Sequence, residues 1–566
     1  MKKPNQKAPD LEQILKRFDR SVNFKQRIGL YDTVRNNENF FIGKQWEGVE
    51  SNGLPKPVFN FLKRVLLYQI ASITSDNIAM QATPISTTAE YRMADVERVA
   101  DIVSRQFEMI FERNRIPWLM RSFLRNAGVM GDACLYTYFD DEIETGQTAR
   151  GDIVTQVVEN TRVHFGNPCS RDVQSQPYIM LHRRLPVEEV RCAAKAEGLK
   201  ELEQIRADSE DYYAEMDSLS DDLCTDITYL WKSRETKTVW MIKCTKQVIY
   251  KQATDTGLTL YPVTWLSWDD ITDSYHGQAE ITGLIPNQVF INKLFAMSMI
   301  SLMTTAFPKI IYDKTRLTNW DTRVGAAMGV MGGDMNSVAK IIDPASISPQ
   351  IAQFIELAQD MTQNNMGASD VALGDTRPDN TSAIVALQRA SNVPLEMVKQ
   401  NLFQCVEQLG RIYIDQMRNY YGKRFVQTPI VGKRERAPLG MELSGVSISE
   451  EFDFSTLKDL PLAMKLDVGA SSYWSEIATV QTLDNLLMQG KIELVDYLER
   501  IPSGYLSKKQ ELIEKLRGAA IPSGEMAAGG APDGAFQAAG TPDSVPLRTG
   551  SGYGALQRAV TQTAQM

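Results

Sequence analysis

The chain has 566 residues, of which 43% are hydrophobic and 23% are charged, and its formal net charge is -9. This composition is typical of a soluble globular protein, and the length predicts two to four domains rather than one core. Proteins that grip nucleic acid tightly are usually basic over the binding face, so the acidic balance excludes all but loose or local contact with nucleic acid.

The cysteines indicate neither a disulfide framework nor a zinc site, because no two lie closer than 20 residues and none forms a CxxC or Cys/His ligand spacing. We expect buried, reduced thiols of an intracellular protein. The N-terminus lacks the apolar stretch of a signal peptide. The best membrane candidate, Leu294–Phe307, is about 14 residues long, which is short of the roughly 20 that a bilayer requires.

In the first half of the chain, periodicity predicts helices followed by antiparallel strands. The helices are expected over 10–45, from Asn60 to about Ala79, and over Tyr91–Asn114, Trp118–Met130 and Pro186–Gln204. The strands are expected after Gly131 up to Tyr138, and over Ile153–Val158, Tyr178–Arg183, Thr228–Trp231, Val239–Cys244, Val248–Gln252 and Tyr261–Leu266. A polar stretch, Ala207–Asp222, is expected to be a surface loop or a short helix.

The central stretch is expected to contain two helices separated by a small insert. In order, its predicted parts are an apolar helix over Leu284–Ala306 with Pro286 in its first turn, an insert over Phe307–Ser346 with two short β-like runs, a helix over Ile347–Met366, a Gly- and Asp-rich loop over Gly367–Asn380, and a long helix kinked at Pro394. A loop longer than about 12 residues between helices is often functional.

The two central helices carry distinct faces. The first places Ser298, Ser301 and Thr305 in a small-residue stripe, with Met297, Met299 and Met303 beside it. The second is amphipathic, with Ile351, Phe354, Ile355, Ala358 and Met361 on one face and Gln353, Glu356, Asp360, Gln363 and Asn364 on the other. An ordinary helix hairpin within one domain is the alternative interpretation.

The C-terminal part begins with the end of the long helix at Tyr421, where Gly422 supplies a stop. Short extended runs are expected over Phe425–Leu466, and helices over Ser475–Tyr497 and Ser507–Arg517. Residues 519–566 are rich in Ala, Gly, Pro, Ser and Gln, which predicts disorder.

Enzyme chemistry has little support in the sequence. There is no GxxxxGK[ST] phosphate loop and no Gly-x-Ser-x-Gly nucleophile elbow. Two acidic clusters, Asp140-Asp141-Glu142-x-Glu144 and Asp269-Asp270, have the residue types of a two-metal nuclease site, although acidic turns at strand ends are commonplace. We interpret His164, His182 and His276 as structural or surface residues.

The order of helix, insert, helix, loop and kinked helix resembles the core of tailed-bacteriophage portal proteins, where these elements are stem helix, clip, stem helix, tunnel loop and wing helix. Two further motifs resemble the portal N-terminal region: Phe41-Ile42-Gly43-Lys44-Gln45-Trp46 before a Leu54-Pro55 turn, and a helix that ends in Gly128-x-x-Gly131 and leads into a strand. The resemblance covers about residues 25–470 and includes portals of the short-tailed phage type.

The resemblance implies an α+β, mainly helical fold with wing, stem, clip and crown, assembled as a ring. The implied parts are the N-terminal wing at 1–283, stem helices at 284–306 and 347–366, the clip at 307–346, the tunnel loop at 367–380, the long kinked helix and remaining wing at 381–470, crown-like helices at 471–518 and a disordered tail at 519–566.

In function, the resemblance implies a non-enzymatic dodecamer at one capsid vertex of the virion, made in the host cytoplasm. The ring would pass double-stranded DNA during packaging and ejection, with no cofactor, metal or membrane. Its partners would be the terminase large subunit, the head–tail connector or adaptor, and the major capsid and scaffolding proteins.

The implied site residues fall into three groups. They are Lys340, Gln353, Glu356, Asp360, Gln363 and Asn364 along the DNA channel, Asp370, Asp375, Arg377 and Asp379 in the tunnel loop, and Trp320 for partner docking. A lining of amides and acids would let a duplex slide, because each lysine or arginine contact with phosphate adds to binding. The alternatives are a metal-dependent nucleic-acid enzyme that uses the acidic clusters, or another structural virion protein such as a connector or scaffold.

Overall fold

The computed structural model divides the chain into two units, Met1–Thr479 and Val480–Met566. It describes residues 8–50, 53, 55–74, 77–84, 93–147, 149–209, 222–306, 310–317, 321, 323, 327–334, 337–341, 350–365, 395–429, 447–458, 462–469, 480, 483–489, 491, 492, 494, 497, 498 and 501. In the second unit, residues 483–488 are helical, within the helix predicted over Ser475–Tyr497. The expectations for Gly367–Asn380, Pro394, Ser507–Arg517 and the tail lie outside the described residues.

The N-terminal helices are α1 (Leu11–Arg27), α2 (Leu30–Ile42) and α3 (Phe61–Ile73). The continuous helix predicted over 10–45 is divided, because Gly29 adopts a φ of 68° that ends one helix and starts the next. The extension of α3 to Ala79 was wrong. Residues 77–84 instead form strand β1 (Asn77–Pro84), which pairs with β14 (Leu462–Gly469) near the other end of the first unit.

Helices α4 (Met93–Arg113) and α5 (Ile116–Met130) follow, and α5 leads directly into β2 (Asp132–Asp140), as predicted. At both glycines of the Gly-x-x-Gly motif, a larger side chain would collide with neighbouring atoms. A Cβ at Gly128 would lie 2.6 Å from Leu66 Cδ1 on α3. Gly131 has a φ of 97°, and a Cβ there would lie 2.7 Å from the carbonyl oxygen of Gly277.

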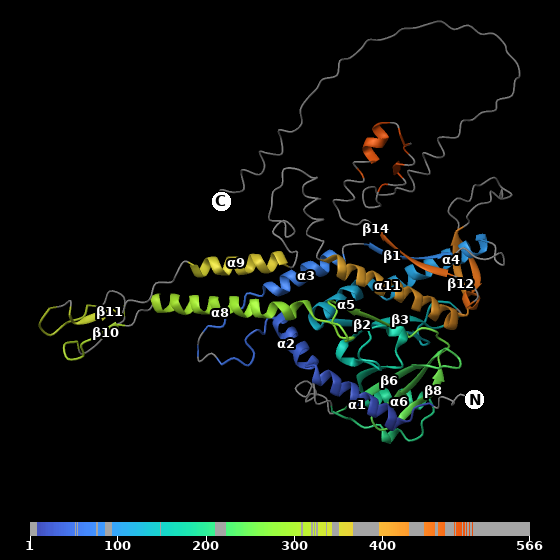
Figure 1. Ribbon diagram of the computed structural model, residues 1–566, viewed down its shortest axis with the longest axis horizontal. Coiled ribbons are helices and arrows are strands. Elements are labelled where there is room, and N and C mark those ends of the chain that lie inside the picture. Colours follow the sequence, from blue (N-terminus) through green and yellow to red (C-terminus); the bar gives the residue numbers. More distant parts are fainter. Residues whose placement is uncertain are drawn as a thin grey trace, which may run out of the picture. The chain divides into compact units, whose positions relative to one another are not determined.

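Two antiparallel sheets lie side by side in the first unit (Figure 1). The three-stranded sheet has the order β3 (Asp152–Glu159), β2 and β9 (Val263–Ser267). The five-stranded sheet has the order β4 (Val163–Phe165), β5 (Ile179–Pro186), β6 (Leu223–Lys232), β7 (Val239–Cys244) and β8 (Ile249–Asp255). Strand β4 was not predicted, because three residues are too few for a visible period. The helix predicted to reach Gln204 is α6 (Val187–Ala196), followed by a 3-10 turn at Leu202–Gln204.

Helix α1 covers one face of the five-stranded sheet. Its buried residues Ile14, Phe18 and Val22 pack in one cluster with side chains of β5, β6 and β7, which include Met180 and Tyr229. The opposite face of β5 and β6 packs through Ile179, Leu181 and Leu230 in a second cluster, which also contains side chains of β2, β3 and β9. The sheet is therefore buried on both faces.

The central helices are α8 (Glu280–Ala306) and α9 (Gln350–Asn365), with β10 (Ile310–Tyr312) and β11 (Ala339–Ile341) paired antiparallel between them in the sequence. This order confirms the predicted helix, two short extended runs and helix. Helix α8 begins four residues before Leu284, so Pro286 lies inside the helix and not in its first turn as predicted.

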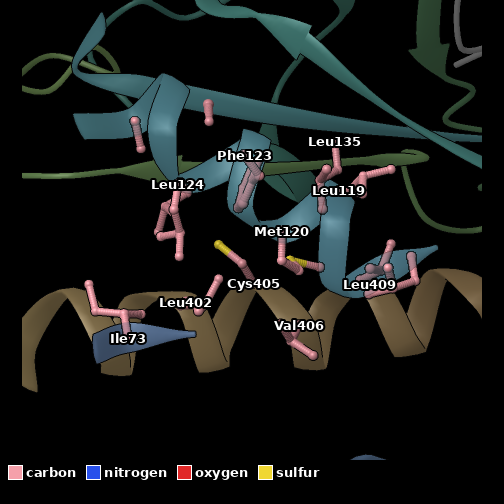
Figure 2. Close-up of a cluster of buried hydrophobic side chains, with 14 of the residues drawn as sticks. Ile73, Leu119, Met120, Phe123, Leu124, Leu135, Leu402, Cys405, Val406 and Leu409 are labelled. Carbon is pink, nitrogen blue, oxygen red and sulfur yellow. The ribbon is translucent and has the colours of Figure 1, made fainter. Parts of the chain in front are cut away.

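Helix α11 (Glu396–Gln416) passes across the core beside α5, and its Leu402, Cys405 and Leu409 point toward the α5 side chains Met120 and Phe123 (Figure 2). It ends in a π-helical turn, Met417–Tyr421, and at Gly422, whose φ of 58° fits the predicted stop. The extended runs that follow are β12 (Lys423–Pro429), which pairs with β13 (Ser447–Asp453), and β14.

Candidate functional site

We call α8, β10, β11 and α9 the arm. Helices α8 and α9 lie side by side, and β10 and β11 lie beyond the end of α8 (Figure 1). The N-terminal half of α8 contacts α2, α3 and α5 in the rest of the first unit, which we call the body. The arm contains every described residue among the predicted channel positions, so its attachment and its surface decide what the chain can do.

A buried chain of amide groups anchors α8 in the body. The Asn292 amide donates to Gln45 Oε1 at 2.6 Å, and the Gln288 amide donates both to Asn292 Oδ1 at 2.9 Å and to the Phe59 carbonyl at 2.7 Å. Gln45 in turn donates to the Phe40 carbonyl at 3.1 Å. These amides fix the register of α8 against residues 40–60, which explains why the Gly-Lys-Gln-Trp segment stands beside this helix.

The first turn of α8 has its own polar anchors. The Glu280 carboxylate accepts from the Trp268 indole at 2.8 Å and from the Gln69 amide at 3.2 Å. The buried Asn37 amide donates to Thr282 Oγ1 at 2.9 Å and to the Val129 carbonyl at 2.8 Å. Hydrogen bonds within a buried environment are costly to break, so the base of the arm is held firmly to the body.

One stripe of side chains runs along α8. It is buried where the helix meets the body and exposed farther along the helix. Residues spaced by 4, 3, 4 and 3 positions share this face: Gln288, Asn292, Phe295, Met299 and Leu302. Gln288 is fully buried and Phe295 packs on Phe59 with ring centroids 4.1 Å apart, whereas Met299 is 40% exposed and Leu302 is 62% exposed. The spacing is that of a helix–helix seam, and its outer half is uncovered in the single chain.

Helix α9 presents three stripes rather than the two predicted. Ile355 is buried, Ala358 packs against the core, and the polar stripe of Gln353, Glu356 and Asp360 is exposed, as predicted. Phe354 and Met361, which were predicted to share the apolar face with Ile355, form a third stripe with Leu357 that is between 48% and 58% exposed. At 100° per residue, this apolar stripe lies between the buried and the polar ones.

The tip of the arm is held by an arginine. The Arg316 guanidinium donates to the carbonyls of Gly332 and Asp334 and to Ser337 Oγ. The apolar side chains of β10 stand in solvent, since Ile311 is 61% exposed. Lys340 lies opposite Ile311 in the strand pair and is exposed. This environment is that of a solvated lysine on a short strand.

The structure places Gln353, Glu356 and Asp360 on one exposed stripe of α9, and it places Lys340 apart from them on the exposed surface of β11. Gln363 and Asn364 lie in α9, but their side chains are outside the described residues. Trp320 and the predicted tunnel-loop residues Asp370, Asp375, Arg377 and Asp379 also lie outside them.

The acidic clusters do not form a metal site among the described residues. Asp140 accepts a hydrogen bond from the Glu142 backbone at 3.0 Å, which closes a turn after β2. Asp270 forms an ion pair with Arg171, and Asp269 is bridged to Gln278 through its backbone. These contacts are those of structural turns, so the geometry gives no support to the nuclease alternative.

A buried polar cluster was not predicted from the sequence. We call it the histidine cluster, and its members are Ser21, Lys25, Asp132, His164, His182 and His276. All three histidines are buried, so the structural interpretation is confirmed and the surface alternative is wrong. The sequence contained one indication of this buried cluster. Lys25 lies on the apolar face of α1, four residues after Ser21 and three after Val22.

Lys25 is the centre of the histidine cluster. Its ammonium donates to the carbonyls of Asn160, Thr161 and Val163 at 2.8, 2.8 and 2.6 Å, which match its three N–H groups. Burial lowers the pKa of Lys25, and the nearby Asp132 carboxylate opposes that shift. Asp132 is itself held by His276 at 2.8 Å, the Gly277 backbone at 2.7 Å and the Ser267 hydroxyl at 2.9 Å.

The cysteines are all free, and four are buried, as expected, but Cys169 and Cys192 are exposed, which corrects the expectation of six buried thiols. Burial raises the pKa of the Cys405 thiol to about 12, so this thiol is inert at neutral pH. Within the described part of the chain, no helix has the length and apolar character needed to span a membrane.

Comparison with known protein families gives a match over residues 182–449 to the family described as Phage P22-like portal protein. The matched segment runs from β5 through the arm and α11 into β13, and therefore contains the element order on which the resemblance rested. A comparison with curated proteins finds no match. The predicted resemblance to tailed-phage portal proteins is confirmed.

Proposed function

We propose, from the premise that this chain is a tailed-phage portal protein over the matched residues 182–449, that it forms the ring-shaped DNA conduit of a capsid vertex. The family implies a homo-oligomeric, structural component of the virion. The finer proposal rests on the division of the arm surface into separate polar and apolar stripes. In a ring of identical copies, the apolar stripes can contact neighbouring copies while the polar stripe faces the channel.

The apolar stripes provide the contacts between neighbouring copies. The outer half of the α8 stripe, with Met299 and Leu302, and the α9 stripe, with Phe354, Leu357 and Met361, leave large apolar side chains in solvent. Each such side chain gains roughly 1.5–3 kcal/mol when it is buried. In a ring, the arm of each copy covers these stripes on its neighbour, and the Met side chains adapt to the helix that they meet.

The polar stripe of α9 then faces the channel. Helix α9 contains Glu356 and Asp360 and no lysine or arginine. Phosphate contacts with basic side chains release counterions and hold nucleic acid, so a surface without them does not bind the duplex tightly. We propose that double-stranded DNA slides past Gln353, Glu356, Asp360, Gln363 and Asn364 in both directions, during packaging and ejection.

The tip of the arm is the proposed docking site for the terminase large subunit and later for the head–tail connector or adaptor. Its described part supports this role through the exposed apolar side chains of Ile310, Ile311 and Met331. Trp320 remains a predicted anchor, since aromatic anchors often contribute about 2 kcal/mol or more at interfaces. Trp320→Ala rings that capture terminase and connector normally in a pull-down would remove Trp320 from this role.

The loop Gly367–Asn380 is the proposed tunnel loop, with Asp370, Asp375 and Asp379 outnumbering Arg377. Its acidic balance would repel phosphate weakly and limit adhesion of DNA. Deletion of Leu373–Arg377 removes no part of a helix predicted from the sequence, so rings should form while packaging or retention of DNA is impaired. Deletion rings that package and retain full-length DNA at the normal rate would end this assignment.

The experiment that tests the conduit itself combines imaging with a charge change. Negative-stain images of the purified protein should show rings with a central hole. The double variant Glu356→Lys, Asp360→Lys should assemble but retain duplex DNA in a salt-dependent manner, because two basic residues per copy now face the channel. The control Glu396→Lys, Glu407→Lys on α11 makes the same charge change in the body. A monomeric protein, or equal DNA retention by both variants, would contradict the proposal.

A further inference from the structure

Helix α1 is attached to the five-stranded sheet through the histidine cluster as well as through apolar packing. Ser21 Oγ lies 2.8 Å from His164 Nδ1, and His164 Nε2 lies 2.9 Å from His182 Nδ1. Phe18 of α1 packs edge-on against both imidazoles, with centroid distances of 5.0 and 5.3 Å. One hydrogen-bonded line thus runs from the helix through β4 into β5.

We propose that the His164–His182 pair is an acid-sensitive latch, which holds α1 on the sheet at neutral pH and releases it as both imidazoles take up protons. This proposal concerns the body alone and does not depend on ring formation or on the DNA channel. It rests on the hydrogen-bond line, on the charges that face the pair, and on the burial of both rings.

The charges that face the pair are mainly positive. Lys25 faces it from α1, Arg162 from the 3-10 turn Asn160–Arg162, and Lys246 from the turn between β7 and β8. His276 faces His164 from the segment before α8. The nearby carboxylate, Asp132, is held by His276, Gly277 and Ser267 rather than by either imidazole of the pair.

Protonation is compensated only in part, through a backbone hydrogen bond with Arg162 that raises the pKa of His182. Burial, followed by the positive charge of Lys25, lowers the pKa of both His164 and His182 well below the ordinary value of 6.5. His276 differs, because burial lowers its pKa while its hydrogen bond to Asp132 opposes that shift. Acid therefore penalises the pair more strongly than His276, whose pKa is also lowered but whose protonated form has Asp132 as a partner.

Proton counting explains why release needs both imidazoles. The line from Ser21 to His182 contains one hydrogen between each pair of heavy atoms when both rings are neutral. A first added proton turns one ring into a double donor and leaves the line intact. A second proton places N–H groups on both His164 Nε2 and His182 Nδ1, which face each other at 2.9 Å, so the hydrogen bond is replaced by repulsion.

The sign of the pH dependence follows from the lowered pKa values. The released state, with solvated imidazoles, binds more protons than the closed state, so closure is fully favoured above about pH 6.5 and is weakened as the pH falls below it. Each proton taken up on release raises the opening equilibrium about tenfold per pH unit, and two protons raise it about a hundredfold.

Hydrogen exchange of the full-length protein between pH 7.5 and pH 5, corrected for the intrinsic rate at each pH, tests the latch. We expect peptides of α1 to lose at least tenfold in protection, while peptides of α11 keep theirs. The thiol of Cys244 gives a second readout, because it is buried in the same cluster as Phe18 and becomes accessible on release. Protection of α1 that follows α11 throughout, whether both stay closed or both open, would overturn the proposal.

Variants separate the latch from general acid sensitivity. His182→Gln keeps a donor and an acceptor but cannot take up the second proton, so the midpoint of α1 release should move to lower pH. His276→Gln is the matched control at the third buried histidine and should shift the midpoint less than His182→Gln does, because His276 is outside the hydrogen-bonded line. If His182→Gln does not fold, the exchange profile of the unmodified protein still decides the outcome. Equal midpoints for both variants and the unmodified protein would contradict the role of the pair.

Discussion

The body and the arm differ in how they bury the apolar side chains of their helices. In the body, α5 and α11 enclose Phe123, Leu402 and Leu409 (Figure 2). The Lys25 ammonium and the His164–His182 pair of the histidine cluster are held by hydrogen bonds within the chain. In the arm, Met299, Leu302 and Phe354 stand in solvent at the same helical spacing that is buried elsewhere. The core of the body is enclosed within the single chain, whereas the arm leaves two apolar stripes exposed along its helices.

The junction between the two regions is polar rather than apolar. Gln45, Gln288 and Asn292 form a buried amide chain at the base of α8, and Glu280 and Asn37 add a second set of bonds. Apolar contacts tolerate sliding, but paired amides require one register. The body therefore positions the arm, and the outer stripes of the arm stay exposed; in the proposed ring they would contact other copies of the chain.

The largest expected effect is in the body. Leu402→Ala removes a fully buried side chain at the contact between α11 and α5, and should lower the free energy of unfolding by about 2–5 kcal/mol. Met397→Ala on the same helix is the matched control, since Met397 is 69% exposed. Denaturant unfolding measures both. If the two variants lose equal stability, the body is not the tightly packed region described above.

The junction should respond with an intermediate effect. Asn292→Ala leaves Gln45 Oε1 and the Gln288 amide without one partner each, which should cost about 1–3 kcal/mol. Hydrogen exchange should show the loss at the base of α8 and in residues 40–60, with α1 unchanged. Lys293→Ala, the exposed neighbour in the same helix, is the control. A loss spread evenly over the whole chain would mean that the amide chain does not define a local anchor.

Much of the fold could be predicted from periodicity and from turn residues. Helices α4, α5 and α8, most individual strands of the body and the stop at Gly422 follow from side-chain spacing and from backbone positions that favour glycine. The pairing of β9 with β2 could not be predicted, because strand pairing depends on contacts between residues that are far apart in the chain. The same limit applies to β1, which pairs with β14 across nearly 400 residues.

The candidate site was partly predictable for a similar reason. The polar stripe of α9 follows from the sequence of one helix, and Gln353, Glu356 and Asp360 are exposed as expected. The third stripe was missed because a helical pattern cannot distinguish an apolar face that meets the same chain from one that meets another copy. The histidine cluster was missed because its members come from α1, β2, β4, β5 and the segment before α8, and no local spacing joins them.

The smallest effect on folding is expected in the arm, and it is the most informative one. Leu302→Ser changes a side chain that is 62% exposed, so the free energy of unfolding of the single chain should change by no more than about 0.5 kcal/mol. In the assembly, the same residue would lie in the seam between copies, where loss of its burial costs roughly 1.5–3 kcal/mol per copy. Sedimentation should therefore show weakened assembly of a normally folded chain. Gln353→Ser on the polar stripe of α9 is the control and should assemble normally. Rings of Leu302→Ser that form at the same protein concentration as unmodified rings would show that the outer half of the α8 stripe is an ordinary exposed surface, and the contrast between the enclosed core of the body and the exposed stripes of the arm would then rest on α9 alone.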